Sequence, residues 1–168
     1  MQVSVKKHLR FLWEKKAFLS FTKEEPYRLV HSDADGLPGI TLDHYGTHLV
    51  VQSSSVFGEF LLPFISQSLS EITTLPLYEK STGQIRKMES LPERVGWISE
   101  NKLENPQNAN VSFAGLKLSF NLEKCQKTGL FLDQRENLKS LSQLLEGGAL
   151  KSSVLDICSY VGAWSSVC

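Results

Sequence analysis

The sequence predicts an α+β fold, in which a hairpin-rich central domain with a capping helix is followed by the first β-loop-α unit of a second domain. Three observations predict it. Short runs of alternating apolar and polar residues, separated by clusters of turn residues, recur between residues 27 and 123. Residues 58–70 carry apolar side chains at helical spacing. Residues 154–162 change to an apolar run followed by a glycine-containing turn, a pattern typical of nucleotide-binding sheets.

Residues 3–20 are expected to form the first helix, because apolar residues recur at helical spacing without a glycine or proline. Phe11 and Phe18 lie on a different face from that apolar stripe, which suggests that the helix contacts two bodies. Residues 1–23 hold six lysine and arginine residues against one acid, Glu14. Such a basic arm could contact phosphates, or it could be a solvated helix face. The net charge of zero for the whole chain argues against a strong stand-alone nucleic-acid binder.

The central elements follow in order. Turn chemistry separates the strands, and the Ala114-Gly115 pair indicates a tight hairpin. We expect strands at 27–32, 40–43, 48–53, 77–80 and 97–100, helices at 60–69 and 85–91, an exposed loop at 101–110, and a hairpin at 111–122. A helix at 133–146 would end at Gly147-Gly148. Residues 154–158 are expected to form a buried parallel strand.

Composition and cysteine content exclude several classes of protein. Apolar residues make up 41% and charged residues 21%, as in an ordinary globular protein. The chain has no run of eighteen apolar residues and no secretory signal, so we expect a cytoplasmic protein without a membrane partner. Three scattered cysteines, Cys125, Cys158 and Cys168, predict reduced thiols and no metal site.

The segment KTGLFLDQR, residues 127–135, is the most distinctive motif. Asp133 is placed as a helix N-cap, and Glu136 three residues later completes a capping-box pattern. A well-capped helix explains those two residues alone. It leaves the polar residues around them unexplained, which are Lys127, Thr128, Gln134 and Arg135.

The segment VLDICSYVG, residues 154–162, matches the opening unit of a nucleotide-binding sheet. Asp156 and Gly162 occupy positions of the usual D-x-G-x-G-x-G pattern, whereas Cys158 and Tyr160 replace glycines. Glycine allows the backbone to approach a ligand, and a helix N-terminus favours a carboxylate. Any hydrophobic strand followed by a glycine-containing turn would match as well, so the motif alone leaves both interpretations open.

Taken together, three segments in this order resemble a known family. YRLVHSDADGLPGITLDHYG, KTGLFLDQR and VLDICSYVGAWS are similar to the large-subunit (23S) ribosomal RNA cytosine-5 methyltransferases, and next to the guanine-N7 module of bifunctional enzymes. The resemblance runs from Tyr27 to Cys168. It departs from the family at Cys125-Gln126, where a glycine-containing pair often stands, and at Val161 and Ala163, which replace Thr and Gly.

The resemblance implies an RNA-binding PUA domain, a small α+β domain and a Rossmann-like catalytic domain that uses S-adenosylmethionine. We therefore expect residues 1–26 to be a helix and linker, 27–123 the α+β domain, and 124–168 the start of an incomplete methyltransferase domain. The PUA domain is expected to be absent, so that the chain would be an N-terminal fragment whose Rossmann-like domain is truncated. S-adenosylmethionine binding by this chain is then expected to be weak or absent.

The resemblance also implies the cofactor-binding residues. The KTG-LDQR segment, with Lys127 and Thr128, would lie beside the methionine end of S-adenosylmethionine, and Gln134 and Arg135 would bind its carboxylate. The backbone of Tyr160–Gly162 would face the same end, with Asp156 nearby. A cytosine-5 enzyme uses a catalytic cysteine, but none of the three cysteines lies in a suitable motif. The catalytic residue therefore stays unknown.

The expected function is methylation of a base of 23S ribosomal RNA by the parent protein, with that RNA as partner. Two alternatives stay open. The chain could be a catalytically silent module for RNA positioning or self-association, or its parent could methylate a small molecule. We also expect the strand at 154–158, without parallel neighbours, to pair with a second copy in a homodimer or to be poorly ordered.

Overall fold

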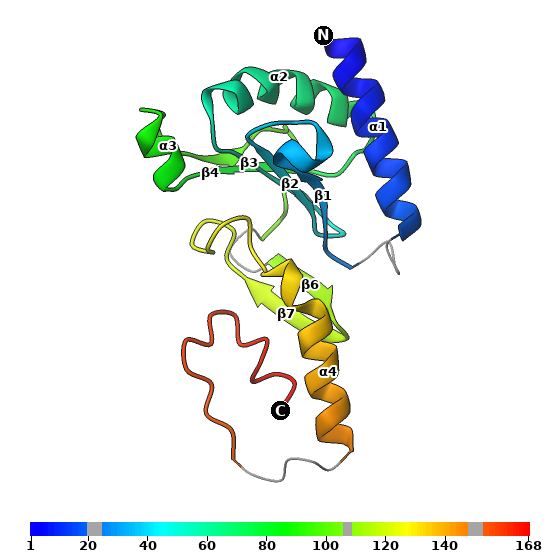
Figure 1. Ribbon diagram of the computed structural model, residues 1–168, viewed down its shortest axis with the longest axis vertical. Helices are drawn as coiled ribbons and strands as arrows, with labels where there is room; N and C mark the ends of the chain where they lie inside the picture. The colour runs from blue at the N-terminus through cyan, green and yellow to red at the C-terminus, as the bar shows by residue number, and fades with distance from the viewer. Residues whose placement is uncertain (20–24, 106–108, 148–152) are drawn as a thin grey trace.

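A computed structural model describes residues 1–19, 25–105, 109–147 and 153–168 (Figure 1). Residue 20 of the first expected helix, Lys23 of the basic segment and Gly148 lie outside these ranges, as do residues 106–108 of the expected loop. None of the helices in the described ranges is long and apolar enough to cross a membrane.

A five-stranded sheet forms the upper body of the molecule, with strand order β1-β2-β3-β4-β5 (Figure 1). Every neighbouring pair is antiparallel except β3 and β4, which are parallel. A parallel pair needs a crossover connection, and α2 supplies it. The expected mixture of mostly antiparallel strands with a helix on the sheet is confirmed. The strands are β1 (Tyr27–His31), β2 (Ile40–His44), β3 (Leu49–Ser53), β4 (Leu77–Ser81) and β5 (Arg94–Trp97).

Two long helices cover one face of this sheet (Figure 1). They are α1 (Gln2–Leu19), which matches the expected first helix, and α2 (Val56–Ser70). The side chain of Ser55 caps α2 by accepting a hydrogen bond from the Gly58 N–H at 3.0 Å. Apolar side chains on one side of each helix pack with the sheet in a single core, formed by Val5, Leu9, Leu12, Leu29, Val30, Leu37, Ile40, Leu42, Leu49, Val51, Leu61, Leu62, Ile65, Leu69 and Leu77.

A second core lies against the opposite face of the sheet. The hairpin of β6 (Ala109–Phe113) and β7 (Leu116–Phe120) packs there, and α4 (Arg135–Glu146) extends below it (Figure 1). Strand β3 is buried on both sides, because Leu49 and Val51 join the first core and Val50 joins the second. Leu130 of the KTGLFLDQR segment and Leu138 of α4 belong to this second core.

Short helical elements stand between the longer ones. A 3-10 turn, η1 (Ser32–Asp35), follows β1, and α3 (Gln84–Met88) follows β4. A second 3-10 turn, η3 (Leu132–Gln134), precedes α4. The short helix expected at 85–91 is confirmed with different ends. The strand expected at 97–100 lies earlier in the sequence. It is β5, which ends at Trp97, and Gly96 within it pairs with Glu79 on β4.

The expected N-cap of the last helix is wrong. Asp133 lies inside η3, and α4 begins only at Arg135, with Gln134 in the N-cap position and no side-chain cap. The Asp133 carboxylate accepts a hydrogen bond from the Gln134 side-chain amide at 3.2 Å. The 3-10 turn thus displaces the helix start beyond Asp133, so that the pattern of Asp133 and Glu136 does not form a capping box.

The strand expected at 154–158 is also wrong. Residues 153–168 form turns without a strand, and the side chains of Leu155 and Ile157 are 82% and 76% exposed. A parallel strand needs neighbours to satisfy its backbone groups, and no described strand lies beside this segment. The chain is therefore a mixed α/β structure, and the β-loop-α unit is not formed by the described residues.

Candidate functional site

The KTGLFLDQR segment is fixed to the central sheet through a buried carboxylate. Arg28 on β1 and Asp43 on β2 are cross-strand partners, and two guanidinium nitrogens of Arg28 donate to the carboxylate oxygens at 2.8 and 3.0 Å. The hydroxyl of Thr128 donates to the same carboxylate at 2.5 Å. Asp43 is fully buried, and its hydrogen bond raises the pKa of Arg28. These bonds explain why Thr128 is fixed, whether or not a ligand binds.

Tyr45 makes the second attachment. Its buried hydroxyl accepts a hydrogen bond from the Leu130 N–H at 3.0 Å, and its ring lies 5.4 Å from that of Phe120. Between these groups Gly129 adopts φ +141°, and a Cβ there would lie 2.6 Å from the Tyr45 hydroxyl and 2.8 Å from Phe120. The motif therefore requires glycine at this position for both backbone conformation and space.

A cavity of about 500 Å³ lies between β1 and the attached segment. That volume lies within the roughly 300–1,000 Å³ range of small-molecule sites. Lys127 and Asp133 contribute opposite charges to its wall, and the Lys127 ammonium lies 5.5 Å from the centre of the Phe131 ring. Tyr27 and His31 from β1 complete the opposite wall. An ammonium and a carboxylate in the wall of one cavity suit a zwitterionic ligand.

Arg135 lines the same cavity, but its guanidinium is bound to the protein. It donates to the Pro26 carbonyl, and its Nε lies 3.6 Å from a carboxylate oxygen of Glu25. The group also lies over the Phe113 ring, at 5.3 Å from the centroid. In this arrangement Arg135 ties the segment before β1 to α4. Gln134 is separate from it, since its amide bonds Asp133 and Asn137.

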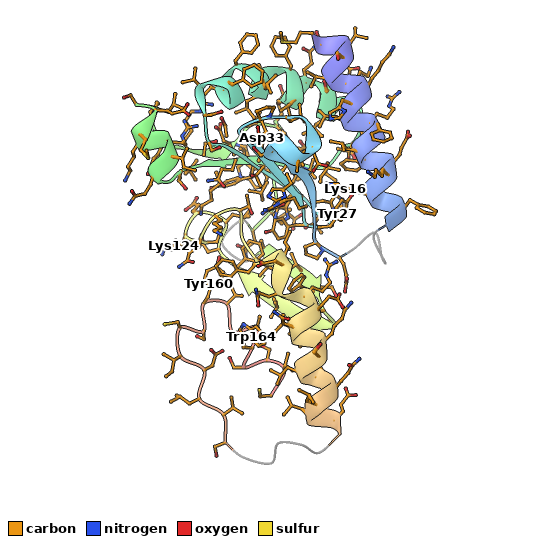
Figure 2. The ribbon with its side chains drawn as sticks, viewed as in Figure 1. Lys16, Tyr27, Asp33, Lys124, Tyr160 and Trp164 are labelled. Carbon is orange, nitrogen blue, oxygen red and sulfur yellow. The ribbon has the colours of Figure 1, made fainter. Side chains whose placement is uncertain are left out.

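Tyr160 brings the C-terminal motif to the KTG segment. Its hydroxyl donates to the Gly129 carbonyl and accepts from the Gln126 N–H, both at 2.9 Å. Its ring meets that of Phe131 edge-on at 5.5 Å. Figure 2 shows Tyr160 where the terminal segment returns to the body of the molecule, with Trp164 further along towards α4. Two motifs that are distant in sequence thus meet at one place.

A second, smaller cavity lies where these motifs meet. It measures about 120 Å³ and is lined by apolar groups, including Phe113, Leu138 and Val161, with Phe131 as a wall shared with the larger cavity. Its volume is below the range of small-molecule sites. Gly162 turns the chain beside it at φ +72°, and the Gly162 N–H donates to the Ser159 carbonyl at 2.8 Å.

Asp156 stands apart from both cavities. Its carboxylate accepts hydrogen bonds from the backbone and hydroxyl of Ser165, at 3.2 and 2.9 Å. Of the predicted site residues, Lys127, Thr128 and Arg135 line the 500 Å³ cavity and Gln134 and Tyr160 line the smaller one, whereas Asp156 closes a local turn.

Burial shifts the pKa of two histidines and one cysteine near the sheet in the direction that favours the neutral form. Burial lowers the pKa of His44 and of His48 to about 4, and His44 adds to the effect on His48. Burial raises the pKa of the Cys125 thiol, although the Lys80 ammonium, 3.3 Å from the sulfur, acts in the opposite direction. A thiol with a raised pKa is a poor nucleophile, which agrees with the absence of a catalytic motif around Cys125.

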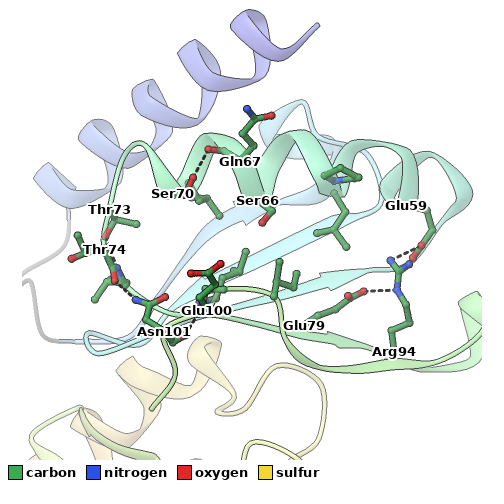
Figure 3. A pocket seen from close by; sticks show the side chains of 17 residues that line it. Glu59, Ser66, Gln67, Ser70, Thr73, Thr74, Glu79, Arg94, Glu100 and Asn101 are labelled. Atoms are coloured by element: carbon green, nitrogen blue, oxygen red, sulfur yellow. Dashed lines mark hydrogen bonds and ion pairs between the residues drawn. The ribbon is translucent and has the colours of Figure 1, made fainter. Parts of the chain in front are cut away.

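A larger cavity of about 740 Å³ lies elsewhere, between α2 and the β4–β5 edge (Figure 3). Three of its charged groups pair with each other, because Arg94 binds Glu59 at 2.5 Å and Glu79 at 3.0 Å. None of the residues that line this cavity belongs to the three sequence motifs. We therefore place the candidate site at the KTGLFLDQR segment.

Sequence reasoning missed Asp43 and Tyr45, which hold that segment. Asp43 is the last residue of the strand expected at 40–43, and Tyr45 stands in the turn expected after it, so neither was expected to bind a distant segment. In the structure Asp43 is a strand residue as expected, and β2 continues to His44. An acid next to an alternating apolar run, opposite an arginine one strand earlier, is the signal that indicates a cross-strand ion pair.

Sequence comparison finds named proteins that are similar to this chain. A protein of Aeromonas salmonicida named ribosomal RNA large subunit methyltransferase I is 34% identical over 139 residues, which cover 82% of this chain and 34% of the relative. The Vibrio cholerae protein of the same name is 34% identical over 140 residues, with the same coverage. This chain is similar to ribosomal RNA large subunit methyltransferases. It spans about a third of the length of these curated relatives. No protein-family model matches the chain.

Structure comparison agrees on the fold. A Streptococcus mutans protein assigned as an S-adenosylmethionine-dependent methyltransferase superposes with a TM-score of 0.76 at 23% identity, covering 99% of this chain and 41% of that one. A structure of a protein assigned as a methyltransferase, in complex with S-adenosylhomocysteine, gives the same TM-score, identity and coverage. The chain thus has the fold of a part of these methyltransferase structures.

Proposed function

We propose that this chain forms part of a cytoplasmic S-adenosylmethionine-dependent methyltransferase that acts on large-subunit ribosomal RNA. The observation that carries the proposal is the meeting of the KTG segment with the turn at Tyr160, through the hydroxyl that bonds both Gly129 and Gln126. Support comes from the relatives, which are named for this activity, and from a structural neighbour in complex with the product of the methyl donor. The finer proposal is a base of 23S ribosomal RNA, at C5 of a cytosine.

The residues of the 500 Å³ cavity beside the KTGLFLDQR segment fit the methionine end of S-adenosylmethionine. That end carries an ammonium and a carboxylate, and Asp133 and Lys127 offer the complementary charges. The backbone at Gly129 has no room for a Cβ, so close packing there is already set by Tyr45 and Phe120. Gln134 lines the adjoining small cavity and is proposed to bind the same end. Arg135 would serve the carboxylate only after release from Pro26 and Glu25.

The remaining proposed site residues position the binding segments and take no part in the reaction. Thr128 fixes the segment through Asp43, and the turn from Tyr160 to Gly162 closes over Phe131. Asp156 would keep that turn in shape through Ser165. S-adenosylmethionine supplies an electrophilic methyl group when bound. No described residue is assigned as catalytic.

The test compares ribosomal RNA from cells with and without the gene for this chain. Digestion to nucleosides and mass spectrometry should show the loss of one methylated base from large-subunit RNA, and its return when the gene is restored. A matched gene carrying Gly129→Ala should fail to restore the methylation, whereas Gly96→Ala, which meets no atom within 4 Å, should restore it. An unchanged set of methylated nucleosides in the deletion strain would overturn the proposal.

A further inference from the structure

The outward side of α1 carries two exposed phenylalanines among cations. We call the α1 outer face the set Lys7, Arg10, Phe11, Lys15 and Phe18, all of which are exposed. The Phe18 and Phe11 side chains are 89% and 56% exposed. They lie seven residues apart, so they share one side of the helix about 10 Å apart along its axis. The helix runs along the edge of the molecule, with α2 beside it (Figure 1).

The inward side of α1 packs against the body of the protein and forms ion pairs with it. Leu9 and Leu12 are buried in the first core. Lys6 forms an ion pair with Glu71, and Lys16 binds Asp35 at 2.6 Å. The cations that face the body of the protein are therefore compensated by carboxylates.

The outward cations differ from these. No ion pair joins Lys7, Arg10 or Lys15 to a carboxylate within the described ranges. Lys15 instead lies over the Phe11 ring, with its ammonium 5.8 Å from the ring centre. Glu14 is the one acid in α1, against five lysine and arginine residues. The helix therefore combines a local positive charge with exposed aromatic rings, although the whole chain is neutral.

We propose that the α1 outer face binds single-stranded RNA, with bases stacked on Phe11 and Phe18 and phosphates bound by Lys7, Arg10 and Lys15. This inference rests on the proposed function and names the surface through which the protein would hold its RNA. Aromatic side chains interleaved with cations are the usual means of binding single strands without sequence preference. Bases in an A-form duplex are already stacked on each other, whereas the bases of a single strand are free to stack on aromatic side chains, which favours an unpaired segment.

The composition of the face distinguishes RNA from a protein partner. Lysine is depleted in protein–protein interfaces, whereas it supplies phosphate contacts in nucleic-acid sites. A second exposed aromatic pair, Phe57 and Phe60 on α2, shows the contrast. These rings lie 6.2 Å apart and are each half exposed, but none of the cation–π contacts among the described residues involves either ring. That pair serves as a matched control.

The test is fluorescence anisotropy of a labelled twelve-nucleotide uridine RNA, titrated with this chain at several salt concentrations. Phe11→Ala with Phe18→Ala should weaken binding by about tenfold or more, because a stacked base contributes about 1–3 kcal/mol. Replacing Lys7, Arg10 and Lys15 by glutamine should reduce the slope of log affinity against log salt by about 0.7 for each lost phosphate contact. Phe57→Ala with Phe60→Ala should leave the affinity within about twofold. All substituted residues are exposed, and circular dichroism checks that each variant folds.

Several outcomes would overturn the inference. Equal binding by the Phe11→Ala, Phe18→Ala variant would exclude stacking on this face. Equal affinity for a duplex of the same length would show charge attraction alone. Absence of RNA binding, with self-association that the same variant abolishes, would identify a protein interface. Because the assay contains no methyl donor, its failure leaves the nucleoside test of the proposed function standing, and a failed nucleoside test would leave an RNA-binding face intact.

Discussion

The hydroxyl of Thr128 donates a hydrogen bond to the buried carboxylate of Asp43, which lies 85 residues earlier in the sequence. Arg28 binds the same carboxylate through two guanidinium nitrogens. One side chain of β2 therefore holds the strand before it and the motif far downstream. The position of the KTG segment depends on the central sheet for this reason, and both parts must fold for the candidate site to form.

Replacing Asp43 by asparagine should lower the free energy of unfolding by about 2–3 kcal/mol. The substitution removes a buried charge partner and leaves the Arg28 guanidinium and the Thr128 hydroxyl imperfectly paired. Urea unfolding followed by circular dichroism measures the change. Asp33→Asn is the matched control, because Asp33 is exposed and a surface change of this kind stays within about 0.5 kcal/mol. Equal stability of the two variants would show that the Asp43 network contributes nothing.

Replacing Gly129 by alanine should be more destabilising than the same change at Gly96. Both glycines have positive φ, at +141° and +153°, so both changes carry a backbone cost. Only at Gly129 does the new Cβ meet other atoms, at 2.6 Å from the Tyr45 hydroxyl. Overpacking of this kind adds about 1–3 kcal/mol. Chemical unfolding of the two variants gives the difference directly, and a difference near zero would mean that Tyr45 and Phe120 move aside without cost.

The local periodicity of the sequence predicted most of the central sheet. The strand expected at 48–53 matches β3, whose apolar run Leu49-Val50-Val51 is buried on both faces, and turn chemistry at Ala114-Gly115 located the β6–β7 hairpin. The start of α4 was not predictable in this way. Asp133 suits an N-cap, but packing of the KTG segment against β1 and β2 places it in a 3-10 turn.

The candidate site was predicted in part. The motif located the segment, but motif letters do not show which side chains the fold itself uses. Thr128 and Arg135 carry polar groups that the sequence makes equally available to a ligand, and the structure binds them to Asp43 and Pro26. The strand expected at 154–158 needed neighbours that no local pattern can supply, which is why an apolar run became an exposed turn. The domain boundaries at residues 26 and 123 stay predictions.

Acidification should destabilise the chain between about pH 6.5 and pH 4 through His44 and His48. Burial lowers the pKa of both to about 4, from the ordinary value of 6.5. The unfolded chain therefore binds more protons in this range, so stability present above pH 6.5 is lost as the pH falls towards 4. Each histidine contributes up to about 3 kcal/mol to that loss.

The pH effect is isolated by comparing variants. Because carboxylates also begin to titrate near pH 4, wild type is compared with His48→Gln, which removes one of the two shifted groups. The His48→Gln variant should lose less stability than wild type on going from pH 7 to pH 4.5. His31→Gln is the control, since His31 is exposed and should leave the difference unchanged. Parallel stability curves for wild type and His48→Gln would contradict the prediction.

Self-association through the terminal segment stays a prediction, and its exposed side chains now define the test. Leu155 and Ile157 are largely exposed on a segment without a strand partner, which is a surface that tends to be covered. We expect sedimentation equilibrium to show concentration-dependent dimers that Leu155→Asp with Ile157→Asp abolishes. Leu144→Asp on α4, which is 57% exposed, should leave the dimer unchanged. A monomer at all concentrations would remove the homodimer from consideration.

We expect this chain by itself to bind S-adenosylmethionine only in the millimolar range. The cavity beside Lys127 and Asp133 suits the methionine end, whereas the cavity beside Tyr160 measures about 120 Å³ and is too small for a nucleoside. In doubly wound folds the nucleotide binds outside the carboxyl ends of parallel strands, and no strand follows α4 in the described residues. Loss of the contacts to adenine and ribose removes several kcal/mol, and each 1.4 kcal/mol lowers affinity tenfold.

Isothermal titration with two ligands separates the parts of this argument. If only the methionine end is recognised, methionine and S-adenosylmethionine should bind with Kd values within about tenfold of each other, since the adenosine adds little. Lys127→Ala should weaken both equally, whereas Lys139→Ala should weaken neither, because Lys139 pairs with Glu136 on α4 and lines neither of these two cavities. Micromolar binding of S-adenosylmethionine with much weaker binding of methionine would show that the chain already holds an adenosine site. The cofactor would then lie elsewhere than beside the KTG segment, and the roles proposed for Lys127 and Asp133 would be wrong.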